Sequence, residues 1–367
     1  MTIGIGILGC GAVSRMHMKA YLQLAGLCEV RAVYDIDSRQ AERLARWEGA
    51  SAGVCASWED LLARDDIHAI SVCTPPDLHR GPVIEALRAG KHVLCEKPLA
   101  PSLDDCDAMI AAARENGRLL GVAMQTRFNR DYERMKRVLD SGALGPLRFA
   151  QLNATCWRGE HYYEAPWRGT WERQSGGVAI NQALHALDVF VWLLGEVESV
   201  QADMETVQQG IEVEDVAMAM LRFRGGLPAL FGCSVNAVRS EIRMDISGYT
   251  KAVSYPLGYH ALLVRDGASV APDVAAAREL ERIGNGSEQA GNQEPGDVHI
   301  RLMNDFLRAI AEKREPAMNG AQGRRVVEVI TAIYKSASTG ERVQLPIDTA
   351  DPWYTTAGIL EHVRRAR

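Results

Sequence analysis

Short apolar runs alternate with amphipathic segments along the first 123 residues, and this pattern constrains the fold of the chain more than any other feature. The runs cover residues 3–8, 28–34, 53–56, 69–73, 92–95 and 119–122. Short runs that alternate with helical patterns are typical of parallel strands joined by crossover helices. The sequence therefore predicts an N-terminal α/β domain with a parallel, doubly wound sheet over residues 1–125.

The pattern changes after a predicted helix over residues 129–139. Longer strand-like runs cover 147–157, 197–208, 213–223, 228–235 and 241–248, and Gly225-Gly226 marks a hairpin. We expect helices over 179–194, 298–313 and 321–338, and a mobile loop over 265–297. The second domain, residues 126–367, is therefore predicted to be α+β with a mostly antiparallel open sheet. It would bind substrate and form the oligomer, and its C-terminal helices are able to pack back on the first domain.

Composition and charge narrow the class of protein. The 367 residues are 47% hydrophobic and 24% charged, which is typical of a folded chain large enough for two domains. Lysine and arginine total 41 against 47 acidic residues, so the net charge of −6 argues against nucleic acid as a partner. Because no apolar stretch approaches the roughly 18 to 20 residues that span a bilayer, and no signal peptide is evident, we expect a cytoplasmic protein without membrane contact. Eight cysteines without a CxxC pair predict reduced thiols and no metal site.

A glycine-rich loop follows the first predicted strand. Gly9, Gly11 and Ser14 have the spacing of a dinucleotide fingerprint between a buried strand and a helix. Gly9 permits a tight turn, and Gly11 lets a pyrophosphate approach backbone amides at the positive end of the helix, where Ala12 and Val13 follow. Ser14 replaces the third glycine, whose task is close helix packing. The alternative is a glycine turn in an α/β protein that binds no nucleotide.

An acidic residue ends the second predicted strand. Asp35 lies twenty-one residues beyond Ser14, where a carboxylate accepts hydrogen bonds from the adenosine ribose and repels a 2′-phosphate. We therefore expect NAD as the cofactor. Arg39 is close enough in the sequence to leave NADP open.

Three further motifs carry a family resemblance. They are Cys73-Thr74-Pro75-Pro76-Asp77-Leu78-His79, Glu96-Lys97-Pro98-Leu99 and Asn181-x-x-x-His185. Together with the glycine loop they resemble the Gfo/Idh/MocA family of NAD(P)-dependent oxidoreductases, which act mainly on sugars and cyclitols. The resemblance covers essentially the whole chain. It implies that the cofactor contacts Thr74, Pro75, His79, Glu96 and Lys97.

Lys97 is the predicted acid/base. It follows the fifth strand at the carboxyl edge, where open α/β sheets bind ligands, and Pro98 restricts the backbone beside it. Burial next to an oxidised nicotinamide would lower the pKa of this amine toward neutrality. The resemblance implies that Lys97 removes a hydroxyl proton while a hydride leaves the same carbon. The alternative is a surface lysine paired with Glu96.

A predicted helix carries three polar residues on one face. Asn181, His185 and Asp188 are spaced by four and three residues. The resemblance implies that His185 contacts the reacting hydroxyl or assists proton transfer, with Asn181 beside it and Asp188 orienting its neighbours. Many family members have aspartate where this chain has Asn181, and an amide cannot take a proton, so proton relay should rest on Lys97 and His185. Alternatively, His185 is a core residue; a zinc site lacks a third ligand.

Residues 157–171 contain three of the seven tryptophans and two tyrosines. Aromatic faces pack against the C–H face of a sugar ring, and nearby polar groups bind its hydroxyls. We therefore expect a substrate wall that includes Tyr163, with Gln125, Arg127 and Asn129 near the same cleft. Trp167-Arg168 resembles a family element that reaches toward the cofactor, so we assign it to either ligand. The alternative is a dimer contact or a seal between domains.

Together these features predict an oxidoreductase that interconverts a secondary alcohol and a ketone on a sugar, sugar derivative or cyclitol. Two alternatives remain: a non-catalytic NAD-binding regulator, and an NAD-dependent glycosidase. The resemblance also implies a homodimer or homotetramer formed through the outer face of the second sheet.

Overall fold

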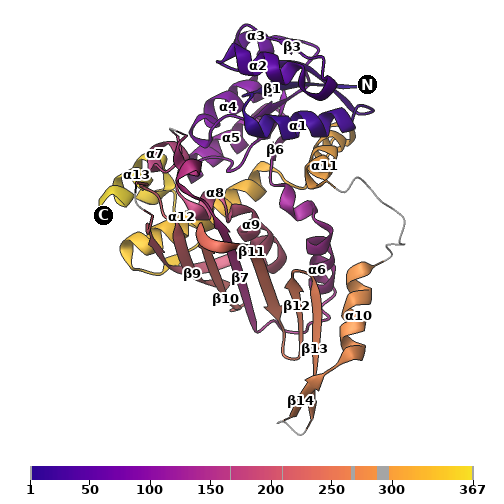
Figure 1. Ribbon diagram of the computed structural model, residues 1–367, viewed down its shortest axis with the longest axis vertical. Helices are drawn as coiled ribbons and strands as arrows, with labels where there is room; N and C mark the ends of the chain where they lie inside the picture. Colours follow the sequence, from indigo (N-terminus) through magenta and orange to yellow (C-terminus); the bar gives the residue numbers. More distant parts are fainter. Residues whose placement is uncertain (1, 166, 209, 266–268, 287–296, 366–367) are drawn as a thin grey trace. The chain divides into compact units, whose positions relative to one another are not determined.

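The computed structural model describes residues 2–165, 167–208, 210–265, 269–286 and 297–365 (Figure 1). The chain divides into two compact units. The first unit comprises residues 1–125, 295–327 and 354–357, and the second comprises 126–294, 328–353 and 358–367.

The first unit is built on a six-stranded parallel sheet in the order β3-β2-β1-β4-β5-β6. Its strands are β1 (Ile3–Leu8), β2 (Cys28–Tyr34), β3 (Gly53–Val54), β4 (Ala69–Val72), β5 (His92–Cys95) and β6 (Leu120–Val122). The order reverses between β1 and β4, and both strands are buried along their whole length. The predicted parallel, doubly wound sheet is confirmed, and its reversal point is where such folds bind dinucleotides.

Helices of the first unit begin and end at the local signals in the sequence. They are α1 (Ala12–Gln23), α2 (Ser38–Ala45), α3 (Trp58–Leu62), α4 (Arg80–Arg88), α5 (Leu103–Glu115) and α11 (Val298–Glu312). The Ser57 hydroxyl accepts the Asp60 amide at the start of α3, as its capping pattern predicts. Gly90, with φ of +78°, follows the end of α4. In Figure 1, α11 lies beside α1, and its Phe306 and Met303 join the core.

The second unit contains a nine-stranded sheet in the order β14-β13-β12-β11-β7-β10-β9-β8-β15. The strands are β7 (Phe149–Trp157), β8 (Val197–Glu205), β9 (Val216–Phe223), β10 (Pro228–Ser234), β11 (Asn236–Ser247), β12 (Lys251–Tyr255), β13 (Gly258–Arg265), β14 (Ser269–Pro272) and β15 (Val343–Gln344). Neighbouring strands are antiparallel except β7 and β10, which are parallel. The predicted mostly antiparallel open sheet is therefore confirmed.

The remaining helices are α6 (Arg130–Asp140), α7 (Trp171–Gln174), α8 (Val178–Asn181), α9 (Leu184–Leu194), α10 (Val274–Asn285), α12 (Gly320–Thr339) and α13 (Thr356–Arg365). Two expectations were wrong here. The single helix over 179–194 is broken into α8 and α9 at Gln182 and Ala183. The loop over 265–297 contains β14 and α10, whose N-terminus is capped by Asp273; residues 266–268 and 287–296 of that loop lie outside the described residues.

The two faces of the second sheet differ. Along β9, Ala217, Ala219 and Leu221 are buried, while Met218 and Met220 on the other face are more than half exposed.

Within the described ranges, no single helix is long and apolar enough to cross a membrane. The segments Trp171–Asn181 and Leu184–Leu194 are long and apolar enough only when they are counted together, and they are bent by 53° where they meet.

Candidate active site

The predicted site residues of the first unit follow the carboxyl ends of neighbouring strands. Gly9 follows β1, Asp35 follows β2, Thr74 follows β4, Lys97 follows β5 and Gln125 follows β6. Because these strands are parallel and adjacent, all five residues belong to one edge of the sheet. That edge is the candidate cofactor edge.

The glycine loop leaves a space at the start of α1. Gly9 has φ of +85°, and a Cβ there would lie 2.8 Å from the Cys73 carbonyl group, so only glycine fits. A Cβ at Gly11 would meet no described atom within 4 Å. The buried Ser14 hydroxyl donates to the Gly11 carbonyl oxygen at 2.6 Å. Ala12 is exposed, and Val13 packs against the core.

The N-terminus of α1 suits an anionic group. No described side chain caps this helix, and its first turn carries no acidic residue. Its first backbone amides and its helix dipole therefore point into the space beside Gly11. The pyrophosphate of a dinucleotide fits this arrangement.

Asp35 is held against the glycine loop by two backbone amides. Its Oδ2 accepts the Cys10 amide at 2.6 Å, and its Oδ1 accepts the Asp37 amide at 2.8 Å. Each carboxylate oxygen has a further lone pair for a ribose hydroxyl. Ile36, which is 95% exposed, adds an apolar surface beside it. The Arg39 side chain is exposed, and its amide donates to Asp37 at the start of α2.

His79 lies inside the protein. Its Nδ1 is 2.9 Å from the Pro98 carbonyl oxygen, and its Nε2 is 2.9 Å from that of Thr74. The ring is fully buried, and burial lowers its pKa. His79 thus joins the turn after β4, which includes Pro75, to the segment after β5. The side chain of this predicted cofactor ligand is therefore buried and is not exposed at the cofactor edge.

Glu96 is also directed inward. It is 7% exposed, its Oε1 lies 2.8 Å from His17 Nε2, and its Oε2 accepts the Lys97 amide at 3.1 Å. Burial disfavours the charged carboxylate, but the hydrogen bond and charge of His17 outweigh it, together with Lys97, and lower the pKa of Glu96 to about 2. A surface pair between Lys97 and Glu96 is therefore inconsistent with the burial of Glu96. Lys97 itself is half-buried.

In the second unit, Asn181 supports a glycine turn. Its Nδ2 donates to the carbonyl oxygens of Gly176 at 2.9 Å and Gly177 at 3.3 Å. A carboxylate at this position would face the same oxygens and repel them. The side chain is buried and ends α8, so it does not share a continuous helix with His185.

Glu214 also holds this turn, and it was not among the residues predicted from the sequence. It is 2% exposed and accepts the Gly177 amide at 2.8 Å, the Ala179 amide at 3.0 Å and the Tyr334 hydroxyl at 3.0 Å. Burial raises its pKa to about 7, although the three donors oppose the rise. The available signal was the acidic pair Glu214-Asp215 directly before an apolar strand.

His185 and Asp188 share α9 but have different surroundings. Asp188 is buried, and its carboxylate accepts Arg127 Nε at 2.7 Å and Arg127 Nη2 at 2.5 Å. Arg127 is itself 7% exposed and therefore does not line a cleft. His185 lies nearly one turn before Asp188 and is half-buried. The Asn129 side chain caps α6 by accepting the Asp131 amide, so it too has a structural task.

The aromatic segment forms one wall of a cavity of about 1230 Å³ in the second unit. Arg168 lies 3.9 Å from the Tyr162 ring centre, and Arg158 lies 5.3 Å from it. Trp157 is 60% exposed. Other described residues of the lining are Gly159, Glu160, His161, Val207, Gln208 and Asn236. The cavity therefore combines an apolar ring surface with guanidinium and amide donors.

The other aromatic residues of this segment lie elsewhere. Trp171 is buried edge-on against Tyr334, with ring centres 5.0 Å apart, so it belongs to the core. The Trp167 ring lies beneath the Arg168 guanidinium at 4.9 Å. Tyr163 is half-buried, and burial raises its pKa to about 12.

Family models match both units. Residues 3–124 match the oxidoreductase family with an NAD-binding Rossmann fold, and residues 132–254 match the C-terminal domain of the same GFO/IDH/MocA family. The chain belongs to the Gfo/Idh/MocA family. This confirms the predicted family and the NAD-binding Rossmann domain.

Named relatives act on sugars and cyclitols. The chain is 35% identical over 198 residues to inositol 2-dehydrogenase of Burkholderia multivorans, which covers 53% of this chain and 56% of the relative. The chain thus spans about half the length of that curated relative. It is 25% identical over 345 residues to 1,5-anhydro-D-fructose reductase of Ensifer adhaerens, covering 93% and 98% of the two chains. The WlbA dehydrogenase of Bordetella pertussis, solved in complex with NADH and UDP-GlcNAcA, superposes with a TM-score of 0.81 and 29% identity over 95% of this chain and 99% of that one.

Proposed function

We propose that this protein is an NAD(P)-dependent oxidoreductase that interconverts a secondary alcohol and a ketone on a sugar, sugar derivative or cyclitol, with Lys97 as the acid/base. The observation that carries the proposal is the position of Lys97. It lies on the edge of the sheet that bears the glycine loop, and a buried carboxylate binds its backbone amide. An amine so placed is suited to proton transfer at a ligand bound along that edge.

The residues of the first unit fit a dinucleotide. The Gly9–Val13 loop and the start of α1 would hold the pyrophosphate, and Asp35 would accept the ribose hydroxyls. Thr74 and Pro75 would border the nicotinamide half. When bound, the nicotinamide accepts or supplies the hydride. Asp35 favours NAD, because its charge repels a 2′-phosphate.

Lys97 and His185 would handle the proton. In oxidation, the Lys97 amine takes the hydroxyl proton as the hydride leaves the carbon; in reduction it returns that proton to the carbonyl oxygen. His185 would hold the same oxygen by a hydrogen bond. Asn181 cannot take a proton, and its amide supports the Gly176–Gly177 turn, so we assign it a holding role.

The aromatic cavity would bind the ring of the substrate. The exposed face of Trp157 offers a surface for sugar C–H groups, and Arg158, Arg168 and Asn236 offer hydroxyl partners. Tyr163 and Gln125 are further candidates for substrate contact. The named relatives, which act on inositol and anhydrofructose or bind a nucleotide sugar acid, support this substrate class.

A substrate panel tests the proposal. The purified protein is incubated with sugars and cyclitols and with NAD⁺ or NADP⁺, and NADH or NADPH formation is followed by absorbance. Lys97→Met should lower kcat at least about 100-fold and leave the NADH Kd within a few-fold. Lys91→Met is the matched control, because Lys91 precedes the other end of the same strand and donates to the Arg64 and Ile67 carbonyls. Near-normal kcat in Lys97→Met would refute the role of Lys97.

Two other outcomes would favour the alternative functions. NADH binding without turnover of any panel member would support a regulator. Release of reducing sugar from a glycoside without net NADH would support a glycosidase.

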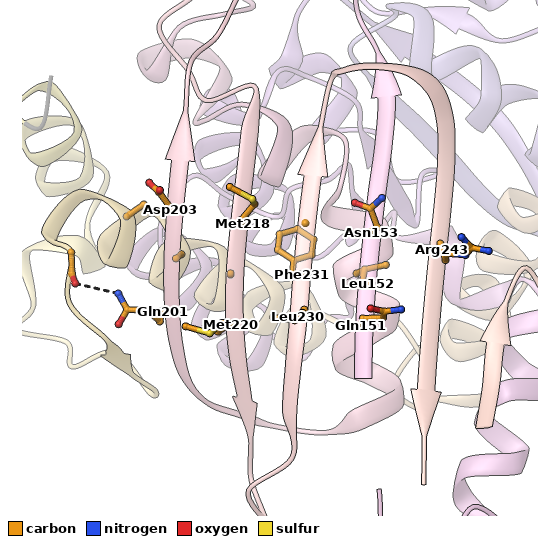
Figure 2. A pocket seen from close by; sticks show the side chains of 15 residues that line it. Gln151, Leu152, Asn153, Gln201, Asp203, Met218, Met220, Leu230, Phe231 and Arg243 are labelled. Carbon is orange, nitrogen blue, oxygen red and sulfur yellow. Dashed lines mark hydrogen bonds between the residues drawn. The ribbon is translucent and has the colours of Figure 1, made fainter. Parts of the chain in front are cut away.

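We also propose that the open face of the second sheet forms a homodimer or homotetramer. Figure 2 shows this face, where Met218, Met220 and Leu230 border a hollow of about 790 Å³. These three side chains are 56%, 53% and 46% exposed. An apolar patch of this kind is typical of a contact with another protein surface. Met218→Glu combined with Leu230→Lys should yield monomers in sedimentation velocity; an unchanged oligomer would place the contact elsewhere.

A further inference from the structure

A chain of buried polar side chains runs through the first unit to the residue before Lys97. The Tyr21 hydroxyl lies 2.6 Å from Ser71 Oγ, which lies 3.2 Å from His17 Nδ1. His17 Nε2 lies 2.8 Å from Glu96 Oε1, and Glu96 Oε2 accepts the Lys97 amide at 3.1 Å. His17 and Ser71 are fully buried, and Tyr21 and Glu96 are 2% and 7% exposed.

The donor to Glu96 follows from the chemistry of the carboxylate. An ionised Glu96 only accepts hydrogen bonds, so His17 donates from Nε2. Its other ring nitrogen, Nδ1, shares a hydrogen bond with the Ser71 hydroxyl. Ser71 Oγ in turn shares a hydrogen bond with the Tyr21 hydroxyl. Each of these polar atoms therefore has a partner, and the carboxylate is fixed from both sides.

This arrangement is not explained by stability alone. A buried ion pair or hydrogen-bonded carboxylate typically contributes little net stability compared with apolar side chains of the same volume, because desolvation opposes it. What the chain does provide is position. His17 and Tyr21 lie one turn apart on α1, which also carries the glycine loop at its start. Through Glu96, the same helix is linked to the backbone of Lys97.

We propose that His17 is a positioning residue for Lys97. It holds Glu96 in the one orientation that binds the Lys97 amide, and so sets the point on the sheet edge from which the lysine side chain extends. The inference rests on the proposed function, in which Lys97 is the acid/base.

Three variants test the inference by kinetics. His17→Leu should lower kcat about 10- to 100-fold, the range expected when an acid/base group is displaced by about 1 Å, and should leave the NADH Kd within threefold. His17→Gln keeps an N–H donor for Glu96 and should recover most of that loss. His92→Leu is the control, because His92 begins β5, the strand that leads to Glu96, and its Nδ1 accepts the Leu119 amide. It should lower Tm without lowering kcat.

A second measurement does not depend on turnover. Acylation of lysines by a water-soluble ester, quantified by mass spectrometry, reports the reactivity of Lys97 in each variant. The rate at Lys97 should change at least threefold in His17→Leu and less than twofold in His17→Gln, with other lysines unchanged. If wild-type protein oxidises no substrate, the proposed function fails, and the acylation rates still decide the role of His17.

Three results would overturn the inference. The first is that His17→Leu keeps the wild-type kcat and the wild-type rate of Lys97 acylation. The second is that His17→Gln loses as much kcat as His17→Leu. The third is that the His92→Leu control loses as much kcat as His17→Leu. If His17→Leu does not fold, Glu96→Gln replaces it, with the same expected loss of kcat and the same change in Lys97 acylation.

Discussion

Replacing Glu214 with glutamine should change how the stability of the second unit depends on pH. The buried Glu214 carboxylate accepts two backbone amides and the Tyr334 hydroxyl. Burial nevertheless raises its pKa from the usual 4.5 to about 7. Glutamine has nearly the same shape but does not titrate.

The sign and size of the effect follow from linkage. In the unfolded chain Glu214 loses its proton near pH 4.5, whereas in the folded state it keeps the proton until about pH 7. Between these values the folded state binds more protons than the unfolded state, so stability falls as pH rises. A pKa rise from 4.5 to about 7 corresponds to a loss of about 3 kcal/mol across that window.

The assay compares urea unfolding of wild-type and Glu214→Gln protein from about pH 5 to pH 8. Tryptophan fluorescence is a suitable probe, because Trp171 packs edge-on against Tyr334 in the same unit. Since both proteins share every other titrating group, the difference between their free energies of unfolding isolates Glu214. Wild type should lose about 2 to 3 kcal/mol relative to the variant between the two pH limits.

Tyr334→Phe sharpens this test. It removes a donor that stabilises the charged carboxylate, so the fall in stability should extend to higher pH. Parallel stability curves for wild type and Glu214→Gln over the whole range would refute the raised pKa and the reasoning from burial.

Three further predictions concern single residues. Asp35→Ala should weaken NAD⁺ binding about 10- to 100-fold and NADP⁺ binding less, as measured by calorimetry; equal losses would refute the assignment of Asp35 to the ribose. Gly9→Ala should lower the free energy of unfolding by at least about 1 to 2 kcal/mol, because φ at Gly9 is +85°. Gly11→Ala should instead keep Tm and weaken NADH binding. A larger loss of stability in Gly11→Ala than in Gly9→Ala would contradict the assigned roles. Ser175→Gly should raise the free energy of unfolding by about 1 kcal/mol, because Ser175 has φ of +66° and its buried hydroxyl has no partner among the described residues; a fall in Tm would count against this explanation.

Much of the first unit follows from local signals. The runs over residues 3–8, 28–34 and 92–95 become β1, β2 and β5 at the same bounds, because buried parallel strands require apolar side chains on both faces. The glycine spacing and Asp35 also predict the phosphate loop and the carboxylate beside it, because these residues act locally. A tight turn next to a helix start constrains residues that are close together in the sequence.

The second unit was less predictable where helices are short. Asn181, His185 and Asp188 have the spacing of one helical face, yet the chain bends at Gln182 and Ala183. Hydrogen bonds from Asn181 to the Gly176–Gly177 turn, and from that turn to Glu214, stabilise the bend. Helical periodicity contains no information about such partners.

By itself, the sequence of this protein determined where the strands of the first unit lie along the chain. It also determined the glycine loop, the family and the edge of the sheet on which Lys97 lies. Only the tertiary structure decided that Glu96 and His79 face inward, that Arg127 pairs with Asp188, and that His17 contacts Glu96 79 residues away. The physical reason is that a buried polar group must find a hydrogen-bond partner wherever packing brings one. Apolar periodicity and turn residues act over a few neighbouring positions, whereas these partners come from distant elements that meet only in the folded chain.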